Sequence, residues 1–144
     1  MNLNERNNRQ LAYNVLDYPW CVVPGCRQIL FDETHGWASD GLIGDYTIEA
    51  GFRELAAFLQ RRGHIVHSLQ DPAPLDLPTL GRYDVLVLML PKEAYTVPEK
   101  EAIARWVRDG GRLVTVSDWT TWANPSPDIL NEVHAYVGDG LIHA

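Results

Sequence analysis

The chain has 144 residues, of which 46% are hydrophobic and 22% are charged, and its formal net charge is −7 at pH 7. These values suit one folded domain, and the negative charge argues against the basic surface that nucleic acids and anionic membranes require. The sequence has no apolar run of membrane-spanning length, and its polar start lacks the apolar core of a signal peptide, so we expect a cytoplasmic protein.

Residues 1–26 are predicted to form an N-terminal arm, and residues 27–144 a single domain. The arm starts with a polar, asparagine-rich stretch and ends with apolar residues that need cover, so it can dock on the domain or form a homo-oligomer. The two cysteines, Cys21 and Cys26, flank a Pro-Gly turn. A disulfide between them is geometrically feasible, but free thiols are the expectation in a reducing cytoplasm.

The domain opens with a short apolar strand, Gln28–Asp32, which turn-forming residues follow at once. Residues 33–46 then form a long loop, and such a loop inside a compact domain is often functional. A helix is expected from about Thr47 to Arg62, because apolar residues recur there at helical spacing. Gly63 is placed to end this helix.

His64–Leu69 is predicted to be the second strand. Tyr83–Leu90 is the clearest strand, because its continuous apolar run is typical of a central parallel strand that is covered on both faces. Thr96 and Glu99 have capping-box spacing with a proline in the first turn, which predicts a helix that runs to about Asp109.

A glycine pair ends that helix, and Arg112–Val116 is predicted to be the next buried strand. Ser126 is an expected N-cap with proline at the first helical position, and Gly138 is expected to end the helix that follows. Leu141 and Ile142 suggest the beginning of a last strand.

This alternation of buried strands and amphipathic helices predicts an α/β fold: a three-layer, doubly wound, mainly parallel sheet of the flavodoxin-like type. Right-handed crossovers give the strand order 2-1-3-4. Ligands in such sheets bind where the carboxyl ends of the strands meet. Residues 32–37, 91–95 and 117–122 are expected to converge at that edge.

The candidates for chemistry at this edge are Asp32, His35, Ser117 and Asp118. Asp32, His35 and Asp118 are the types of residue that bind a divalent cation such as Ca²⁺ or Mg²⁺, and carboxylate and imidazole can also act as acid and base. Ser117 with His35 as its base is a further alternative, although the chain lacks the glycine-flanked elbow of nucleophilic serines. The plainer alternative is that Asp32 caps the loop through backbone N–H groups.

Aromatic residues share this predicted rim. Rings beside carboxylates suit a sugar or polyol, whose apolar faces stack while the acids take the hydroxyl groups, but aromatic residues also anchor protein interfaces or simply cover the sheet. The predicted partner is therefore a small polar molecule or a protein. The full predicted ligand-binding set is Asp32, Glu33, His35, Trp37, Tyr95, Ser117, Asp118 and Trp119.

Four segments together resemble the class I glutamine amidotransferase-like superfold: Phe31–Gly36, Tyr83–Val87, Glu101–Val107 and Gly110–Val114. The likeness is to members that are not amidotransferases and that open with a strand ending in Asp-x-x-His-Gly. Similar domains occur in the intraflagellar-transport and gliding-motility-associated group, in trehalose-utilisation-type proteins and in beta-galactosidase accessory domains. The resemblance covers about residues 28–135 and implies the same α/β fold.

One departure from that superfold bears on activity. Amidotransferases carry a nucleophilic cysteine after the strand that corresponds to Leu113–Val116, and a His-x-Glu pair downstream, whereas this chain has Ser117 at that place and no such pair. The resemblance therefore implies a domain without glutaminase activity that binds a sugar, polyol or peptide, or that serves as an interaction module. The alternative is a hydrolase, metal-assisted or not, with its site at the ends of the first and fourth strands.

Overall fold

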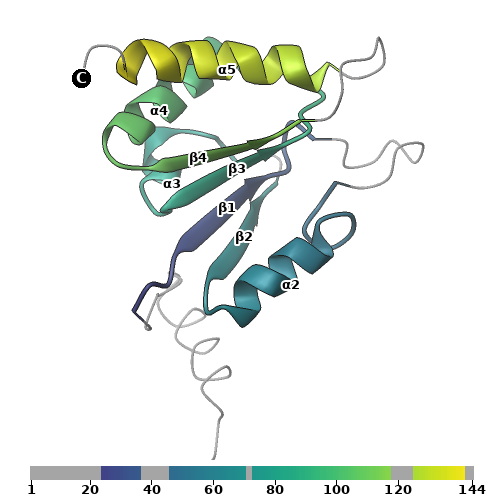
Figure 1. The fold of residues 1–144 in the computed structure, drawn as a ribbon. Coiled ribbons are helices and arrows are strands. Elements are labelled where there is room, and N and C mark those ends of the chain that lie inside the picture. The colour runs from purple at the N-terminus through teal and green to yellow at the C-terminus, as the bar shows by residue number, and fades with distance from the viewer. Residues whose placement is uncertain (1–23, 37–45, 71–72, 118–124, 142–144) are drawn as a thin grey trace, which may run out of the picture.

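The computed structural model describes residues 24–36, 46–70, 73–117 and 125–141. Within these ranges strands and helices alternate, which confirms the predicted α/β class (Figure 1). The elements, in chain order, are β1 (Gln28–Asp32), α2 (Arg53–Arg61), β2 (Ile65–Leu69), α3 (Leu77–Leu80), β3 (Val85–Met89), α4 (Val97–Arg108), β4 (Arg112–Val116) and α5 (Ser126–Leu141).

The four described strands form one parallel sheet in the order β2-β1-β3-β4, as predicted. β1 pairs with β2 on one side and β3 on the other, so that Leu30 lies between His67 and Leu86. Because all the strands point the same way, the residues that follow β1 and β3 emerge together at one edge of the sheet.

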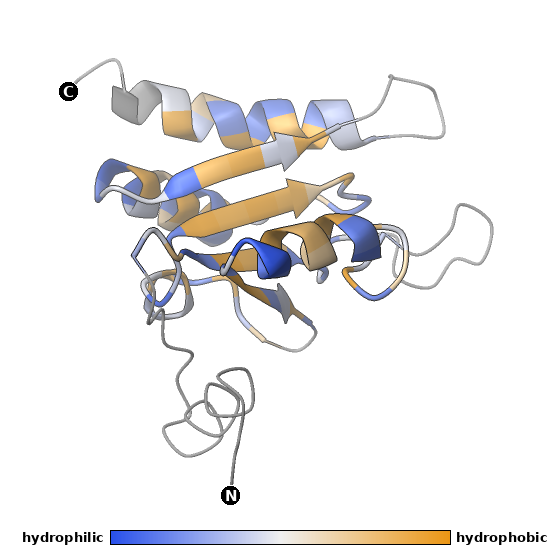
Figure 2. Ribbon diagram, turned by 60° about the horizontal axis from the view of Figure 1, so that its bottom comes forward, coloured by the Kyte–Doolittle hydropathy of each residue, from blue (hydrophilic) through white to orange (hydrophobic). Residues whose placement is uncertain are grey.

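Helices cover both faces of the sheet, so the fold has three layers (Figure 1). Figure 2 shows that apolar residues concentrate in the strands and on helix faces beside them. On one face, a core cluster joins Leu30, Leu86 and Leu88 to α3, α4 and α5. On the other face, Phe31 and Val87 belong to a second cluster that packs against α2. The two central strands are therefore covered on both sides, as their continuous apolar sequences predicted.

β4 differs from the prediction of a buried strand. It lies at the edge of the described sheet, and its residues alternate between exposed and half-buried. Val114 in its middle is 45% exposed. Apolar composition alone does not distinguish an edge strand from a central one, because both can bury at least one face.

Helix α4 follows its prediction closely. Thr96 and Glu99 form the capping box, a proline occupies the first turn, and the helix ends at Arg108. Gly110 follows with a positive φ of 107°, a conformation that suits glycine. Local sequence signals are strong at both ends of this helix, so its limits could be predicted.

Helix α2 is shorter than predicted. It begins at Arg53, and the residues from Thr47 to Phe52 form turns instead, with the Phe52 N–H donating to the Thr47 carbonyl. Phe52 stands at the N-cap and provides no side-chain hydrogen bond. Gly51 lies at the predicted first turn, where its backbone freedom disfavours a helix.

Two other predictions were wrong near the ends of elements. α5 continues through Gly138 to Leu141, so Leu141 is helical and does not begin a strand, while Ile142 lies outside the described residues. A single glycine inside a helix costs only about 1 kcal/mol relative to alanine, which neighbouring turns can offset. The short helix α3 was missed, although Asp76 caps it by accepting from the Thr79 N–H at 2.9 Å.

Cys26 is bonded in a disulfide, which corrects the expectation of free thiols for this residue. Cys21 lies outside the described residues, as does most of the predicted N-terminal arm. Among the helices in the described part of the chain, none has the length and apolar character needed to cross a bilayer.

Candidate functional site

The candidate site lies at the carboxyl edge of the sheet, where the segments after β1 and β3 meet. Asp32 is the last residue of β1, and His35 follows in the adjoining loop. The carbonyl oxygen of His35 accepts hydrogen bonds from the backbone N–H groups of Lys92 (2.6 Å) and Glu93 (3.2 Å), in the loop after β3. These bonds fix the two loops to each other and bring Tyr95 within reach of Asp32.

The Asp32 carboxylate is buried and accepts four hydrogen bonds. The Thr34 N–H (3.0 Å) and hydroxyl (2.6 Å) donate to Oδ1. Tyr95 donates its hydroxyl to Oδ2 at 2.7 Å, and Nδ1 of His35 lies 2.9 Å from the same atom. A carboxylate offers about four acceptor positions, so Asp32 has no oxygen lone pair left for a metal or substrate.

His35 lies between two carboxylates. Its Nδ1 faces Asp32, and its Nε2 lies 3.3 Å from Oε2 of Glu99 on the first turn of α4. The ring stacks on Tyr95 with centroids 4.1 Å apart and an interplanar angle of 30°. The side chains of His35 and Glu99 are 11% and 21% exposed, so these two groups face the rim of the site.

The network sets the charge of each member. Burial favours the neutral form of Asp32, but its hydrogen bonds and charge interaction with His35 outweigh this and lower the pKa of the carboxyl. Burial favours neutral His35, yet Asp32 and then Glu99 outweigh it and raise the pKa of the imidazole. Burial, followed by the nearby Asp32 charge, raises the pKa of Tyr95 well above its usual value. These shifts favour the imidazolium form of His35 and the neutral form of Tyr95.

Glu33, a predicted ligand-binding residue, makes hydrogen bonds within the protein. Its Oε1 accepts from the Ile48 N–H at 2.8 Å, and its Oε2 from the Gln70 side-chain amide at 3.1 Å. Its own N–H donates to the Leu69 carbonyl. Glu33 thus ties the end of β1 to the end of β2 and to the segment before α2.

The remaining predicted site residues fall into two groups. Ser117 is exposed, and its Oγ lies 3.4 Å from the Oγ of Ser126 at the start of α5. The ring nitrogens of His35, which was the predicted base for Ser117, both face carboxylates. The other predicted residues, Trp37, Asp118 and Trp119, lie outside the described residues.

The described residues do not fit a metal centre. They contain no group of three His, Cys, Asp or Glu side chains placed to hold an ion. The Asp32 oxygens are fully hydrogen-bonded, and each nitrogen of His35 faces a carboxylate. Asp118, the third predicted ligand of a divalent cation, lies outside the described part of the chain.

Sequence reasoning missed Thr34 and Glu99 as members of the site. Thr34 provides two of the four donors to Asp32, and Glu99 faces the outer nitrogen of His35. Glu99 carried a signal, because it is the acidic residue of a capping box on the helix that begins at the predicted site edge. The capping role concealed its second contact.

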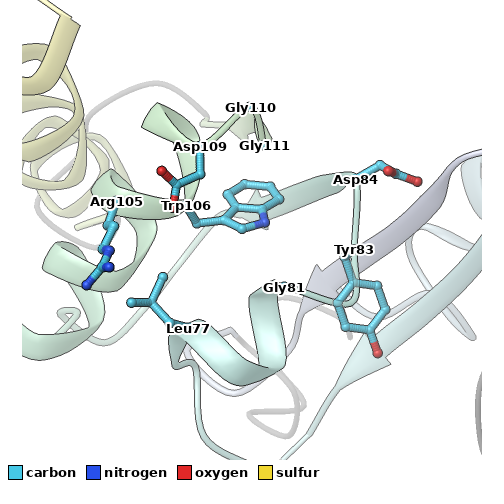
Figure 3. Close-up of a pocket in the computed structure, with 9 residues that line it drawn as sticks. All are labelled: Leu77, Gly81, Tyr83, Asp84, Arg105, Trp106, Asp109, Gly110 and Gly111. Carbon is cyan, nitrogen blue, oxygen red and sulfur yellow. The ribbon is translucent and has the colours of Figure 1, made fainter.

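A pocket of about 540 Å³ lies elsewhere, at the amino ends of β3 and β4 (Figure 3). Trp106 lies at the centre of the residues that line it, with Arg105 on the last turn of α4, Asp109 at the C-cap of that helix and Tyr83 before β3. Parallel α/β sheets bind ligands at the opposite, carboxyl edge. We therefore place the candidate site at His35, where buried charged groups converge.

Residues 46–140 match the model of a family that is described as a domain of unknown function (DUF4350). The match spans more than half of the chain. The chain belongs to the DUF4350 family. Comparison with curated proteins gave no match. The DUF4350 segment includes Tyr95 and Glu99, whereas Asp32 and His35 precede it.

Proposed function

We propose that this DUF4350 chain is a binding module of the amidotransferase-like type, which binds a sugar or polyol at the carboxyl edge of its sheet. The flavodoxin-like strand order supports the relationship. Ser117 at the place of the superfold's cysteine supports a role without glutaminase chemistry. The binding groups are the imidazole of His35 and the carboxylate of Glu99.

The observation that carries this proposal is the saturation of Asp32. Because its four acceptor positions are filled from within the protein, Asp32 orients His35 instead of meeting a ligand. This leaves a ring nitrogen and a carboxylate as the polar groups of the cluster that face the rim. A hydroxyl group both donates and accepts, so adjacent hydroxyls of a sugar or polyol match such a pair.

One part of the expected site has changed. Tyr95 is only 3% exposed, its ring stacks on His35, and its hydroxyl donates a hydrogen bond to Asp32. Tyr95 therefore positions His35 and offers no surface on which a ligand could stack. Recognition therefore depends on hydrogen bonds from His35 and Glu99. A peptide, whose amide groups also donate and accept, is the other ligand class that this pair fits.

Titrating the full chain with neutral monosaccharides, alditols and a tripeptide, followed by NMR, tests the proposal. We expect a sugar or alditol to shift the signals of His35 and Glu99. The Glu99→Gln variant should weaken binding about tenfold, or about 1.4 kcal/mol, because a charged acceptor is lost.

The matched control is His134→Gln, which changes an exposed histidine that contacts Thr115 on β4. This variant should bind like the natural chain. The proposal is wrong if no sugar or alditol binds, or if Glu99→Gln and His134→Gln bind equally well. Binding of the tripeptide alone would replace the polyol by a peptide.

A hydrolase is the second candidate, and one observation favours it. Asp32 holds Nδ1 of His35 so that Nε2 points away from Asp32, toward Glu99 at the rim, and general acid–base histidines are likewise oriented by a carboxylate at one ring nitrogen. Hydrolysis of 4-nitrophenyl acetate and 4-nitrophenyl glycosides by the natural chain and by His35→Gln separates the two candidates. A binding module should show no turnover that depends on His35, whereas a hydrolase should lose its rate in the variant.

A further inference from the structure

We propose that His35 and Glu99 form a proton-operated latch, in which the imidazolium holds the Glu99 carboxylate over the rim of the site and the neutral ring releases it. As a regulation of binding, this inference rests on the function proposed above. The latch itself is a property of the free protein and can be measured without any ligand.

The first step is the position of the His35 protons. The Thr34 hydroxyl donates to Oδ1 of Asp32, so it can only accept from Nδ1 of His35, which lies 2.7 Å away. Oδ2 of Asp32 is also an acceptor. Both neighbours therefore require a proton on Nδ1, in the neutral ring as well as in the imidazolium.

The protonation of Nε2 decides whether His35 attracts or repels Glu99. With the single proton of the neutral ring on Nδ1, Nε2 carries a lone pair and faces Oε2 of Glu99 at 3.3 Å. Two acceptors at this distance repel each other, whereas an imidazolium donates to both carboxylates at once. Only protonated His35 is compatible with the observed pairing, so loss of its proton favours the departure of Glu99.

The third step concerns what holds Glu99 after release. Its Oε2 also accepts from the Thr96 N–H (2.7 Å) and hydroxyl (3.0 Å), and the Glu99 N–H returns a hydrogen bond to the Thr96 hydroxyl. The oxygen that faces His35 is therefore also the oxygen held by the capping box, so its release from His35 alters the bonds to Thr96 while the Glu99 backbone stays on the first turn of α4. Release therefore moves one carboxylate and does not unfold the helix.

The groups that face His35 come from three elements of the fold. Asp32, from β1, remains ionised because its pKa is lowered. Tyr95, from the loop before α4, remains neutral because its pKa is raised. Glu99, from α4, supplies the second carboxylate. Rising pH should therefore open the rim, where Nε2 becomes an acceptor for a ligand hydroxyl.

An NMR pH titration of the full chain without ligand tests the latch. The probes are the ring C–H groups of His35, the side-chain carboxyl of Glu99 and the amide of Thr96. All three should shift with one common midpoint. In Glu99→Gln the His35 midpoint should fall, because glutamine keeps the capping box and removes the charge.

Glu101→Gln, on an exposed position of the same helix, is the matched control and should leave the His35 midpoint unchanged. The latch is refuted if Glu99 and Thr96 do not follow His35, or if the two variants show the same midpoint. Absence of sugar binding would overturn the proposed function and would leave these titrations unaffected, so the two failures can be told apart.

Discussion

The Asp32 carboxylate is 2% exposed and meets four donors from three residues, Thr34, His35 and Tyr95. Each donor belongs to the loop after β1 or the loop after β3. A single buried charge therefore positions both loops, and the ring of His35 takes its orientation from it. The buried charge is tolerated because hydrogen bonds and an opposite charge replace its hydration.

Asp32→Asn tests this positioning role. The amide group has one acceptor oxygen and one donor nitrogen, so at least one of the surrounding donors loses its partner. We expect a loss of about 3 kcal/mol in the free energy of unfolding, measured by urea denaturation. Asp109→Asn, on the exposed C-cap of α4, should change stability by less than about 0.5 kcal/mol. Equal effects of the two changes would contradict the role of Asp32.

His35 gives stability a dependence on pH. Because folding raises its pKa above the ordinary 6.5, its contribution is complete below that pH and is lost as pH rises through the folded-state value. Asp32 has a lowered pKa, so its contribution is present above 3.8 and is lost only in acid. A change in the free energy of unfolding as pH rises above 6.5 therefore reports on His35 and not on Asp32.

The expected result is a difference in unfolding free energy between the natural chain and His35→Gln that is larger at pH 6 than at about pH 9. Urea denaturation at each pH measures it. Half-buried His67, whose pKa is lowered by desolvation, remains in both proteins and cancels in the difference. A constant difference across this range would show that the charge of His35 is not coupled to folding.

Part of this residue-scale picture could be predicted from the sequence. Asp32, His35 and Tyr95 follow strands whose carboxyl ends had to meet, so their proximity followed from topology. The second carboxylate, Glu99, could not be chosen in advance, because its contact depends on where the first turn of α4 lies relative to the loop after β1. The role of Glu33 was missed because it lies next to a site residue but bonds toward β2.

At the scale of elements, the connection from α4 to β4 is a tightly constrained turn. Gly110 has a positive φ, and a Cβ on Gly111 would lie 2.3 Å from ring atoms of Trp106. The indole therefore packs directly on the backbone of the turn. This contact fixes the end of the helix against the beginning of the edge strand.

Gly111→Ala should destabilise the protein by about 1–3 kcal/mol, because the indole has to shift within a packed core. Gly138→Ala provides a matched comparison in α5, where a Cβ meets nothing within 4 Å. There the lower backbone entropy of alanine should stabilise the helix by about 0.5–1 kcal/mol. Thermal unfolding of both variants should show opposite shifts, and shifts of the same sign would contradict the packing.

The limits of a helix could be predicted where the sequence carries both a capping residue at its start and a glycine stop at its end. The capping box and terminal glycines defined α4. The beginning of α2 could not be predicted, because no side chain caps it and Gly51 weakens the first predicted turn. Gly138 resembled a helix stop but lies inside α5. A glycine signal therefore needs a supporting cap before it defines a boundary.

For the whole molecule, the centre and the β4 edge of the described sheet are unequally covered. Val87 of β3 and Val114 of β4 are partners in the sheet register, yet Val87 is 5% exposed and Val114 is 45% exposed. The strand order was predictable from handedness and chain connectivity. The exposure of β4 was not, because it depends on what packs against each face.

Replacing each of these two valines by alanine compares the same chemical change at the centre and at the edge. Val87→Ala should lower the free energy of unfolding by about 2 kcal/mol, because buried methyl groups leave a cavity. Val114→Ala should lower it by no more than about 0.5 kcal/mol. Urea midpoints at an unchanged m-value measure both, and similar losses would show that the edge is buried in solution.

The position of β1 has a practical consequence for work on the family. β1 lies between β2 and β3 in the sheet but precedes residue 46, where the DUF4350 match begins. A recombinant fragment trimmed to the matched limits would lose the strand that joins β2 to β3, together with Asp32 and His35. It would keep Tyr95 and Glu99 without Asp32 and His35, which they contact. Domain boundaries for expression should therefore be set upstream of Gln28.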